Sequence, residues 1–191
     1  MSEPIEVVNR IWSAATPVIS ITGIGGRWWK RNVEKGARIG PWLQAAYQVL
    51  DAAAWRARGP CLYLVGANDG GLRCVGISRN GLRHRWRESP ALDAETGDRL
   101  PQNQLFHSQC WRHLQKELLE TAQRAFVVRS IEAEPLCDVL ASVGPPLSAF
   151  LPLREDGESL VSAVERWICN RRSDRLARWN VAMTGNLDGN R

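Results

Sequence analysis

The stretch CLYLVGANDGGLRCVGIS, residues 61–78, decides the fold of this chain. Its two ends, CLYLVG at 61–66 and RCVGIS at 73–78, are short apolar runs of the kind found in buried β-strands. Between them, Asn68-Asp69-Gly70-Gly71 is a strong turn signal, because glycine and asparagine adopt the backbone angles of tight turns. The sequence therefore predicts an antiparallel β-hairpin over about 61–78.

The segments around this hairpin favour helices and one or two further strands. A β-branched run at 18–22 and an apolar run at 125–131 indicate strands, and a Gly-rich basic stretch at 22–31 is typical of a loop. Apolar spacings of three and four predict helices at 4–15, 41–58, 80–87, 104–124, 134–142 and 157–172. The order predicts an α+β fold, a small three-stranded antiparallel-containing sheet flanked by helices.

The chain is expected to divide into three parts. Residues 1–58 form an N-terminal helical extension that carries the basic Gly/Trp loop, residues 59–183 form the main domain, and residues 184–191 form a flexible tail. The length of 191 residues, with 44% hydrophobic and 24% charged residues, suits one globular domain with extensions.

Charge and cysteine content narrow the possible partners and compartment. The net charge of +5 has the sign expected for a nucleic-acid partner. Five cysteines without a C-x-x-C pair argue against a disulfide framework or a zinc site and indicate buried thiols in a reducing compartment. The N-terminus lacks a signal-peptide pattern, and no apolar run is long enough for a membrane span. We therefore expect a cytoplasmic protein.

Nine tryptophans, several of them beside arginine or lysine, have two interpretations. They serve as stacking platforms for bases, or they fill the core while their cationic neighbours face solvent, which we favour for most of them. The Gly-rich stretch at 22–31 lacks the Lys-Ser/Thr ending of a P-loop and the spacing of a dinucleotide site. Its cations, Arg27, Lys30 and Arg31, are instead candidates for phosphate contacts with DNA.

An ordered set of residues extends the pattern beyond the hairpin. Cys61-Leu62-Tyr63 and Cys74-Val75-Gly76 are followed by Arg85 on a basic helix, Glu165 on a later helix, and Asn180. This set resembles the GIY-YIG nuclease family, in which a G-I-Y strand pairs with a Y-I/V-G strand and an Arg, a Glu and an Asn follow. The resemblance covers about 61–180 and implies a DNA endonuclease that depends on Mg²⁺ or Mn²⁺, with RNA as an open alternative.

The resemblance also implies a role for each residue. Glu165 is the expected metal ligand, since one carboxylate suits Mg²⁺, which keeps most of its waters. Arg85 is expected to hold the scissile phosphate, with Arg83 and Arg87 as further phosphate contacts or as its replacements if the helix register differs by a turn. Tyr63 is expected to position or deprotonate the attacking water, and Asn180 to orient groups around Glu165.

A histidine is the natural base where tyrosine is marginal, because the ordinary tyrosine pKa of about 10 lies far above neutrality. Some restriction-type members of the family carry an auxiliary histidine between the Arg and the Glu. His107 lies in that interval, and His84, directly beside Arg85, is the alternative. We prefer His107.

The chain departs from the family pattern at the chemistry itself. Cys61 stands where the family has Gly, Cys74 stands where it has the second Tyr, and Asn80-Gly81 contains one additional residue. A cysteine is a poor replacement for a tyrosine hydroxyl. Two alternatives therefore remain beside the nuclease: a catalytically weak or inactive GIY-YIG-fold protein that binds nucleic acid, and an interaction module whose basic face meets an acidic protein.

Overall fold

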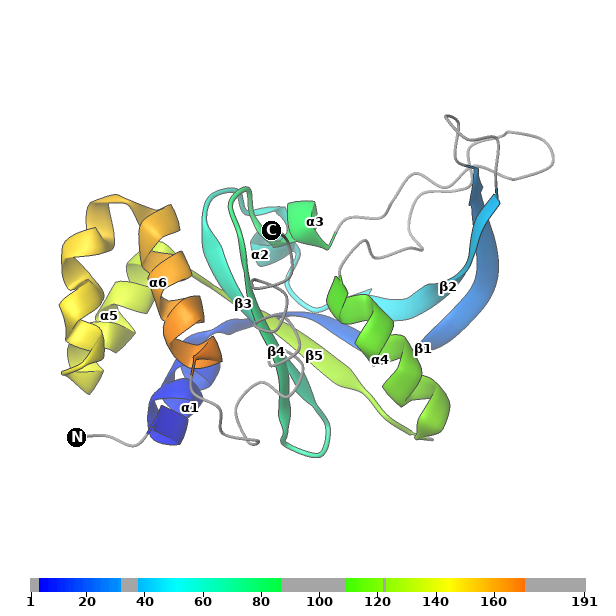
Figure 1. The fold of residues 1–191 in the computed structure, drawn as a ribbon, viewed down its shortest axis with the longest axis horizontal. Helices are drawn as coiled ribbons and strands as arrows, with labels where there is room; N and C mark the ends of the chain where they lie inside the picture. The colour runs from blue at the N-terminus through cyan, green and yellow to red at the C-terminus, as the bar shows by residue number, and fades with distance from the viewer. Residues whose placement is uncertain (1–3, 32–37, 87–108, 122, 171–191) are drawn as a thin grey trace, which may run out of the picture.

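One five-stranded antiparallel sheet with helices on both faces forms the molecule (Figure 1). The computed structural model describes residues 4–31, 38–86, 109–121 and 123–170, without the side chains of 26–31, 38–42, 44 and 109. The strand order is β2-β1-β5-β3-β4, and every neighbouring pair is antiparallel. The elements are α1 (Pro4–Ala14), β1 (Thr16–Arg31), β2 (Arg38–Val49), α2 (Ala52–Arg56), β3 (Cys61–Ala67), β4 (Leu72–Ser78), α3 (Leu82–Arg85), α4 (Gln109–Glu120), β5 (Phe126–Glu132), α5 (Ala133–Val143), the 3₁₀ helix η1 (Leu147–Glu155) and α6 (Gly157–Cys169).

The predicted hairpin is confirmed as β3 and β4. Tyr63 pairs with Gly76 and Val65 with Cys74, and a turn at 68–71 joins the strands. On its other side β3 pairs with β5, whose predicted position is also confirmed. The first six residues of β3 are all buried, because helices cover the sheet on both faces. This explains why the sequence there is a continuous apolar run.

Two hydrophobic cores lie on opposite faces of the sheet. Leu62, Leu64 and Val75 face a core that includes α1, α5, η1 and α6. Tyr63 and Val65, which alternate with them along β3, face a second core built with α2, α3 and α4. Figure 1 shows the two groups of helices on either side of β3 and β4. The three layers leave β4 as an edge strand beside α3, α4 and α6.

The N-terminal part of the chain differs from the prediction. The helix predicted over 41–58 is wrong: β2 and the short α2 occupy this segment, and the predicted loop at 22–31 is the end of β1. The sheet therefore has five strands instead of three, and residues 1–58 supply two of them rather than a purely helical extension. Ile19 and Ile21 of β1 are fully buried where β1 pairs with β5 and β2, so pairing of β2 along the other edge of β1 overrode the local helical pattern of 41–49.

Five of the remaining helices follow the predictions closely, whereas η1 was not expected from the sequence. The helices predicted at 4–15, 134–142 and 157–172 correspond to α1, α5 and α6, and those at 80–87 and 104–124 to the shorter α3 and α4 within the described ranges. Trp55, Trp86 and Trp111 are buried, as the core interpretation of the tryptophans predicts. Within the described part of the chain, no helix is long and apolar enough to cross a bilayer.

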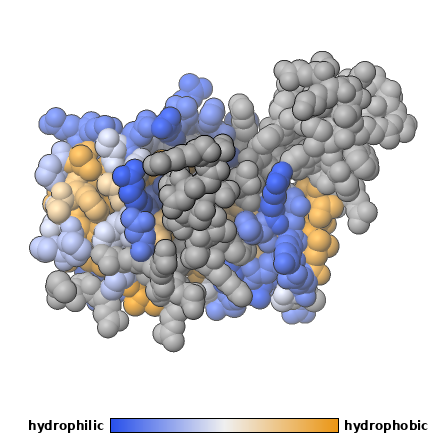
Figure 2. Space-filling view, in the orientation of Figure 1, coloured by the Kyte–Doolittle hydropathy of each residue, from blue (hydrophilic) through white to orange (hydrophobic). Residues whose placement is uncertain are grey.

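An ionic cluster fixes α4 against the β3–β4 turn. Arg73, whose side chain is only 7% exposed, binds Glu117 of α4 at 2.7 Å and also Asp69 of the turn. Arg124 binds the same two carboxylates, Asp69 at 2.6 Å and Glu117 at 3.0 Å. These contacts hold the pKa of Asp69 at about 2, mainly through its hydrogen bond from Arg73. The outward face of α4 is hydrophilic (Figure 2), so α4 packs on the sheet through one side only.

Candidate active site

A cleft of about 510 Å³ opens beside the edge strand β4. Its lining comes from β3, β4, α3, α4 and α6, and it includes Tyr63, Cys74, His84, Arg85, Cys110 and Glu165. Three of the residues expected at the site, Tyr63, Arg85 and Glu165, thus line one cavity although about a hundred residues separate the first from the last. The fold gathers them because β3, α3 and α6 all end or pass beside β4.

Tyr63 owes its place to the glycine opposite it. A Cβ atom at Gly76 would lie 2.5 Å from Cζ and 2.9 Å from Cε1 of the Tyr63 ring, so only glycine lets the phenol cross β4 into the cleft. The ring of Trp86 contacts that of Tyr63 edge to face, with centroids 5.8 Å apart at an interplanar angle of 86°, a favourable geometry for aromatic pairs. The tyrosine side chain is therefore held from two sides.

Arg85 is presented by a short helix that two buried residues anchor. Leu82 and Trp86 are almost completely buried on either side of it in sequence, whereas Arg85 itself is exposed to the cleft. The guanidinium is hydrogen-bonded to the hydroxyl of Tyr63, which raises the pKa of Arg85 above its already high ordinary value. The arginine therefore stays charged at any physiological pH.

The additional residue at Asn80-Gly81 has a structural role. Gly81 has φ +83°, and a Cβ on it would collide with the carbonyl oxygen of Ala57. Its N–H donates to the carbonyl oxygen of Gly59 at 2.7 Å, and its own carbonyl accepts from the hydroxyl of Ser78 at 2.7 Å. This glycine brings the start of α3 close to the segment before β3 and so fixes the position of the helix that carries Arg85.

Burial keeps Tyr63 from acting as a base. It raises the pKa of the phenol well above its ordinary value, the nearby Cys74 and Cys110 add to the effect, and the hydrogen bond from Arg85 opposes it only in part. The hydroxyl is therefore protonated at neutral pH, and it donates and accepts hydrogen bonds instead of removing a proton.

Glu165 lies on the side of α6 that turns from the core to the cleft. Leu160, Val161, Val164 and Ile168 of the same helix are fully buried, while Glu165 is half-buried. Burial raises the pKa of its carboxyl group, and the positive charges of Arg85 and Arg166 lower it by less. Among the described residues Glu165 has no salt-bridge partner within 4.0 Å. A desolvated carboxylate of this kind is stabilised by an added cation.

Glu165 also suits the expected metal ion. In the described ranges, no group of three or more histidine, cysteine or acidic side chains could hold a metal ion by itself. Mg²⁺ does not need such a group, because it retains several waters and is commonly held by one or two carboxylates together with substrate phosphates. The half-buried carboxylate in an open cleft fits that mode of binding.

The other predicted residues divide into three groups. His84 lines the cleft beside Arg85, and Arg83 is exposed on the same helix. Arg27, Lys30 and Arg31 belong to β1, with their side chains outside the description. His107, Arg87 and Asn180 lie outside the described residues.

Two lining residues, Arg79 and Cys110, were missed from the sequence. Arg79 directly follows the second strand of the hairpin, at the end of β4, which was a usable signal. Cys110 is 5% exposed on α4, and nothing local distinguishes it from a core residue.

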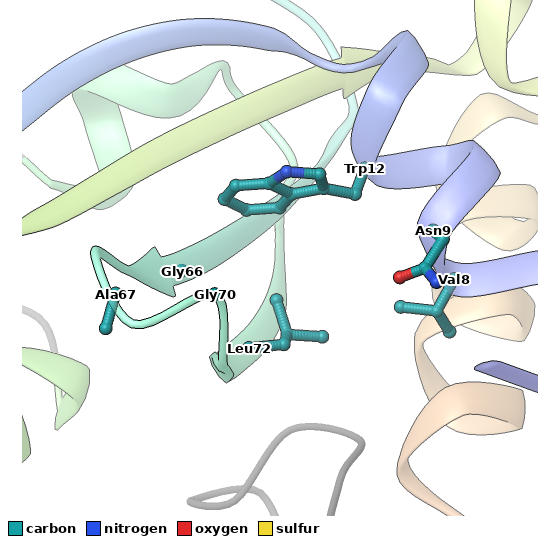
Figure 3. Close-up of a pocket in the computed structure, with 7 residues that line it drawn as sticks. All are labelled: Val8, Asn9, Trp12, Gly66, Ala67, Gly70 and Leu72. Carbon is teal, nitrogen blue, oxygen red and sulfur yellow. The ribbon is translucent and has the colours of Figure 1, made fainter. Parts of the chain in front are cut away.

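A second, smaller pocket of about 90 Å³ lies toward the turn end of the same hairpin. Figure 3 shows the ring of Trp12 from α1 extending over Gly66, with Asn9 and Leu72 nearby. The guanidinium of Arg129 stacks on the Trp12 ring, with its Cζ 4.7 Å from the ring centroid. None of the residues that line the pocket is titratable, so we assign it no chemistry.

The chain matches no protein-family model, and no curated protein or solved structure shows significant similarity to it. The chemistry of the cleft must therefore be argued from its own residues.

Proposed function

We propose that this protein is a cytoplasmic, Mg²⁺-dependent endonuclease of the GIY-YIG type that hydrolyses phosphodiester bonds of DNA in the cleft beside β4. One observation carries the proposal. Tyr63, Arg85 and Glu165, the residues that the resemblance singles out, line the same cavity, and Arg85 is hydrogen-bonded to Tyr63. The three side chains come from β3, α3 and α6, and their convergence on one cavity supports a shared role.

The charges in the cleft suit a phosphodiester. Arg85 is the fixed cation that would hold the scissile phosphate, because a guanidinium offers paired donors to its oxygens. Arg79 lines the same cavity, and Arg83 is exposed on the helix that carries Arg85. Their cationic side chains would receive the neighbouring phosphates of the strand, and this part of the binding would weaken with added salt.

Glu165 would hold the magnesium ion, which supplies Lewis acidity at the phosphate. The rest of the mechanism belongs to the chain. Arg85 would neutralise charge that develops on the phosphate oxygens, and Tyr63 would orient the attacking water through its hydroxyl. Because its raised pKa keeps Tyr63 protonated at neutral pH, it cannot take the water's proton, and a histidine is needed for that step. His107, preferred from the sequence, lies outside the described residues. His84 lines the cleft, and an imidazole is the side chain best suited to accepting a proton near neutral pH.

The second candidate function is nucleic-acid binding without cleavage. The observation that favours it is the environment of the tyrosine position: Tyr63 is almost fully buried with a raised pKa, and Cys74 replaces the phenol that its partner strand carries in the family. A protein that keeps the basic cleft but lacks an efficient base would bind a strand and release it uncut.

A cleavage assay with matched variants tests the proposal. The purified chain is incubated with labelled single- and double-stranded DNA and RNA, with Mg²⁺ or with chelator. We expect metal-dependent cleavage of DNA that is lost in Glu165→Gln and kept in Glu155→Gln, an exposed carboxylate just before α6. A second pair compares His84→Gln, expected to slow cleavage, with His113→Gln, which is exposed on α4 and does not line the cleft.

The outcomes separate the two candidates. Cleavage that Glu165→Gln leaves intact, or that chelator does not affect, contradicts the enzyme. Salt-dependent binding without any cleavage supports the second candidate instead. The absence of both binding and cleavage contradicts both and favours the interaction module, with its basic face toward an acidic protein.

A further inference from the structure

The two thiols of the cleft lie against each other. Cys74 of β4 and Cys110 of α4 both line the cavity, and the Cys110 thiol is hydrogen-bonded to Cys74. The S–H of Cys74 donates to the carbonyl oxygen of Val75 at 3.6 Å. β4 and α4 thus bring the two sulfur atoms together, although α3 lies between them along the chain.

The other three cysteines have different surroundings. Cys61 is buried at the start of β3, Cys137 belongs to the core on the opposite face of the sheet, and Cys169 ends α6. All five described cysteines carry thiols rather than disulfides. The pairing of Cys74 with Cys110 is therefore a specific feature of the cleft.

Access to the pair is one-sided. Both thiols line the cleft, but Cys74 is half-buried whereas Cys110 is only 5% exposed. A small oxidant that enters the cleft would reach Cys74 first, and the only thiol next to the oxidised sulfur would be Cys110. An accessible cysteine with a second cysteine beside it is the usual arrangement of a thiol that is oxidised reversibly.

We propose that Cys74 and Cys110 form a reversible dithiol–disulfide couple in the wall of the cleft, with a hydroperoxide as the oxidant. The sulfur of Cys74 takes one OH group from hydrogen peroxide and becomes a sulfenic acid, while its proton leaves with the other OH group as water. The sulfur of Cys110 then attacks, the S–S bond forms, the S–O bond breaks, and the released hydroxide leaves as water with the proton of Cys110. The peroxide is reduced by the electron pair that the two thiols lose.

The disulfide would stabilise the part of the chain that surrounds the cleft. It closes a covalent loop from β4 to α4, and α3 with Arg85 lies inside that loop. A cross-link of this kind restricts the unfolded chain and raises stability. The couple does not depend on the nuclease proposal, because its formation is a property of the two thiols alone.

Peptide mapping of the full-length protein tests the couple. Reduced protein is treated with stoichiometric hydrogen peroxide, alkylated without reductant and digested with trypsin. We expect the peptides 74–79 and 100–112, which contain Cys74 and Cys110, to be linked with the loss of two hydrogen atoms. The alkylating reagent should still modify the other three cysteines once the protein is denatured. The Tm should rise on oxidation and return on treatment with dithiothreitol.

Matched variants complete the test. Cys74→Ser and Cys110→Ser should abolish the linked peptides and the rise in Tm, whereas Cys137→Ser should behave as the wild type does. Oxidation of Cys74 to the sulfinic acid without a cross-link would overturn the proposal, and so would a disulfide that involves another cysteine. The mapping of the wild-type protein decides the matter even if a variant fails to fold.

Discussion

Gly76→Ala offers the sharpest test of the geometry of the cleft. The added methyl group would lie 2.5 Å from Cζ and 2.9 Å from Cε1 of the Tyr63 ring, well inside ordinary van der Waals contact. The ring cannot turn aside freely, because Trp86 packs edge-on against it at a centroid distance of 5.8 Å and is itself completely buried. We therefore expect the tyrosine to be displaced and its hydrogen bond with Arg85 to be lost.

Three effects set the magnitude. Inserting a methyl group into a well-packed site costs about 1–3 kcal/mol, and losing the hydrogen bond adds about 1 kcal/mol. Alanine also restricts the unfolded chain more than glycine does, which stabilises the folded state by about 0.4–1 kcal/mol. The net loss in the free energy of unfolding is then about 1–3.5 kcal/mol, or roughly 2–14 °C in Tm for a chain of this size.

Gly23→Ala on β1 is the matched control. A Cβ at Gly23 lies 3.7 Å from Cβ of Ala46, an ordinary contact, so only the effect on the unfolded chain remains and stability should be equal or slightly higher. Urea unfolding and thermal denaturation of both variants measure the difference, and DNA cleavage should fall in Gly76→Ala alone. Equal stability of the two variants would refute the close approach of Tyr63 to β4.

Three further predictions concern charged residues. Arg85→Lys keeps the charge but loses the forked donors, and we expect DNA cleavage to fall roughly 100-fold with Tm almost unchanged. Arg73→Met leaves Glu117 with one partner fewer in a buried cluster and should cost about 3 kcal/mol in unfolding free energy. The control Arg10→Met breaks an exposed pair and should cost less than about 0.5 kcal/mol. Equal losses in the two variants would contradict the structural role of the cluster. Glu165→Gln should stabilise the metal-free protein, because burial raises the pKa of this carboxyl group and the wild type loses stability as the pH rises through that pKa. Urea unfolding at acidic and neutral pH should show the gain growing toward neutrality, and Mg²⁺ should diminish it; a gain at neither pH would contradict the buried carboxylate.

The fold was predictable wherever the local pattern and the tertiary environment agree. The hairpin at β3 and β4 has both apolar strands and a turn that few other structures accept, so its prediction is confirmed. The segment now occupied by β2 has apolar residues spaced for a helix, yet exposure alternates along 45–50 as in a strand. Only the partner strand β1, with its buried Ile19 and Ile21, reveals which pattern applies. No local property of 41–58 contains that information.

The same reasoning applies to the cleft. The positions of Tyr63, Arg85 and Glu165 were expected from their order along the chain, and the fold brings them to one cavity. Cys110 was not expected there, because its approach to Cys74 depends on how α4 crosses the sheet. That crossing is set by the ionic cluster around Arg73, whose members lie on the turn, the strand and the helix. Such a contact cannot be deduced from spacing within any one of them.

The two sets of charges in this structure imply different purposes. In the cluster of Arg73 and Glu117 each charge has an opposite partner, and the side chains are only 7% and 16% exposed; such pairing stabilises a fold and leaves nothing for a ligand. Glu165 is half-buried without a salt-bridge partner in the described ranges, and the Tyr63 hydroxyl is buried with a raised pKa. The desolvated carboxylate of Glu165 reduces stability where it stands, and groups with perturbed pKa values are common at sites that bind or transform a substrate. A phosphate with a cation would satisfy Arg85 and Glu165 together, so under the proposed function the cleft would be more stable with a bound phosphodiester than without one.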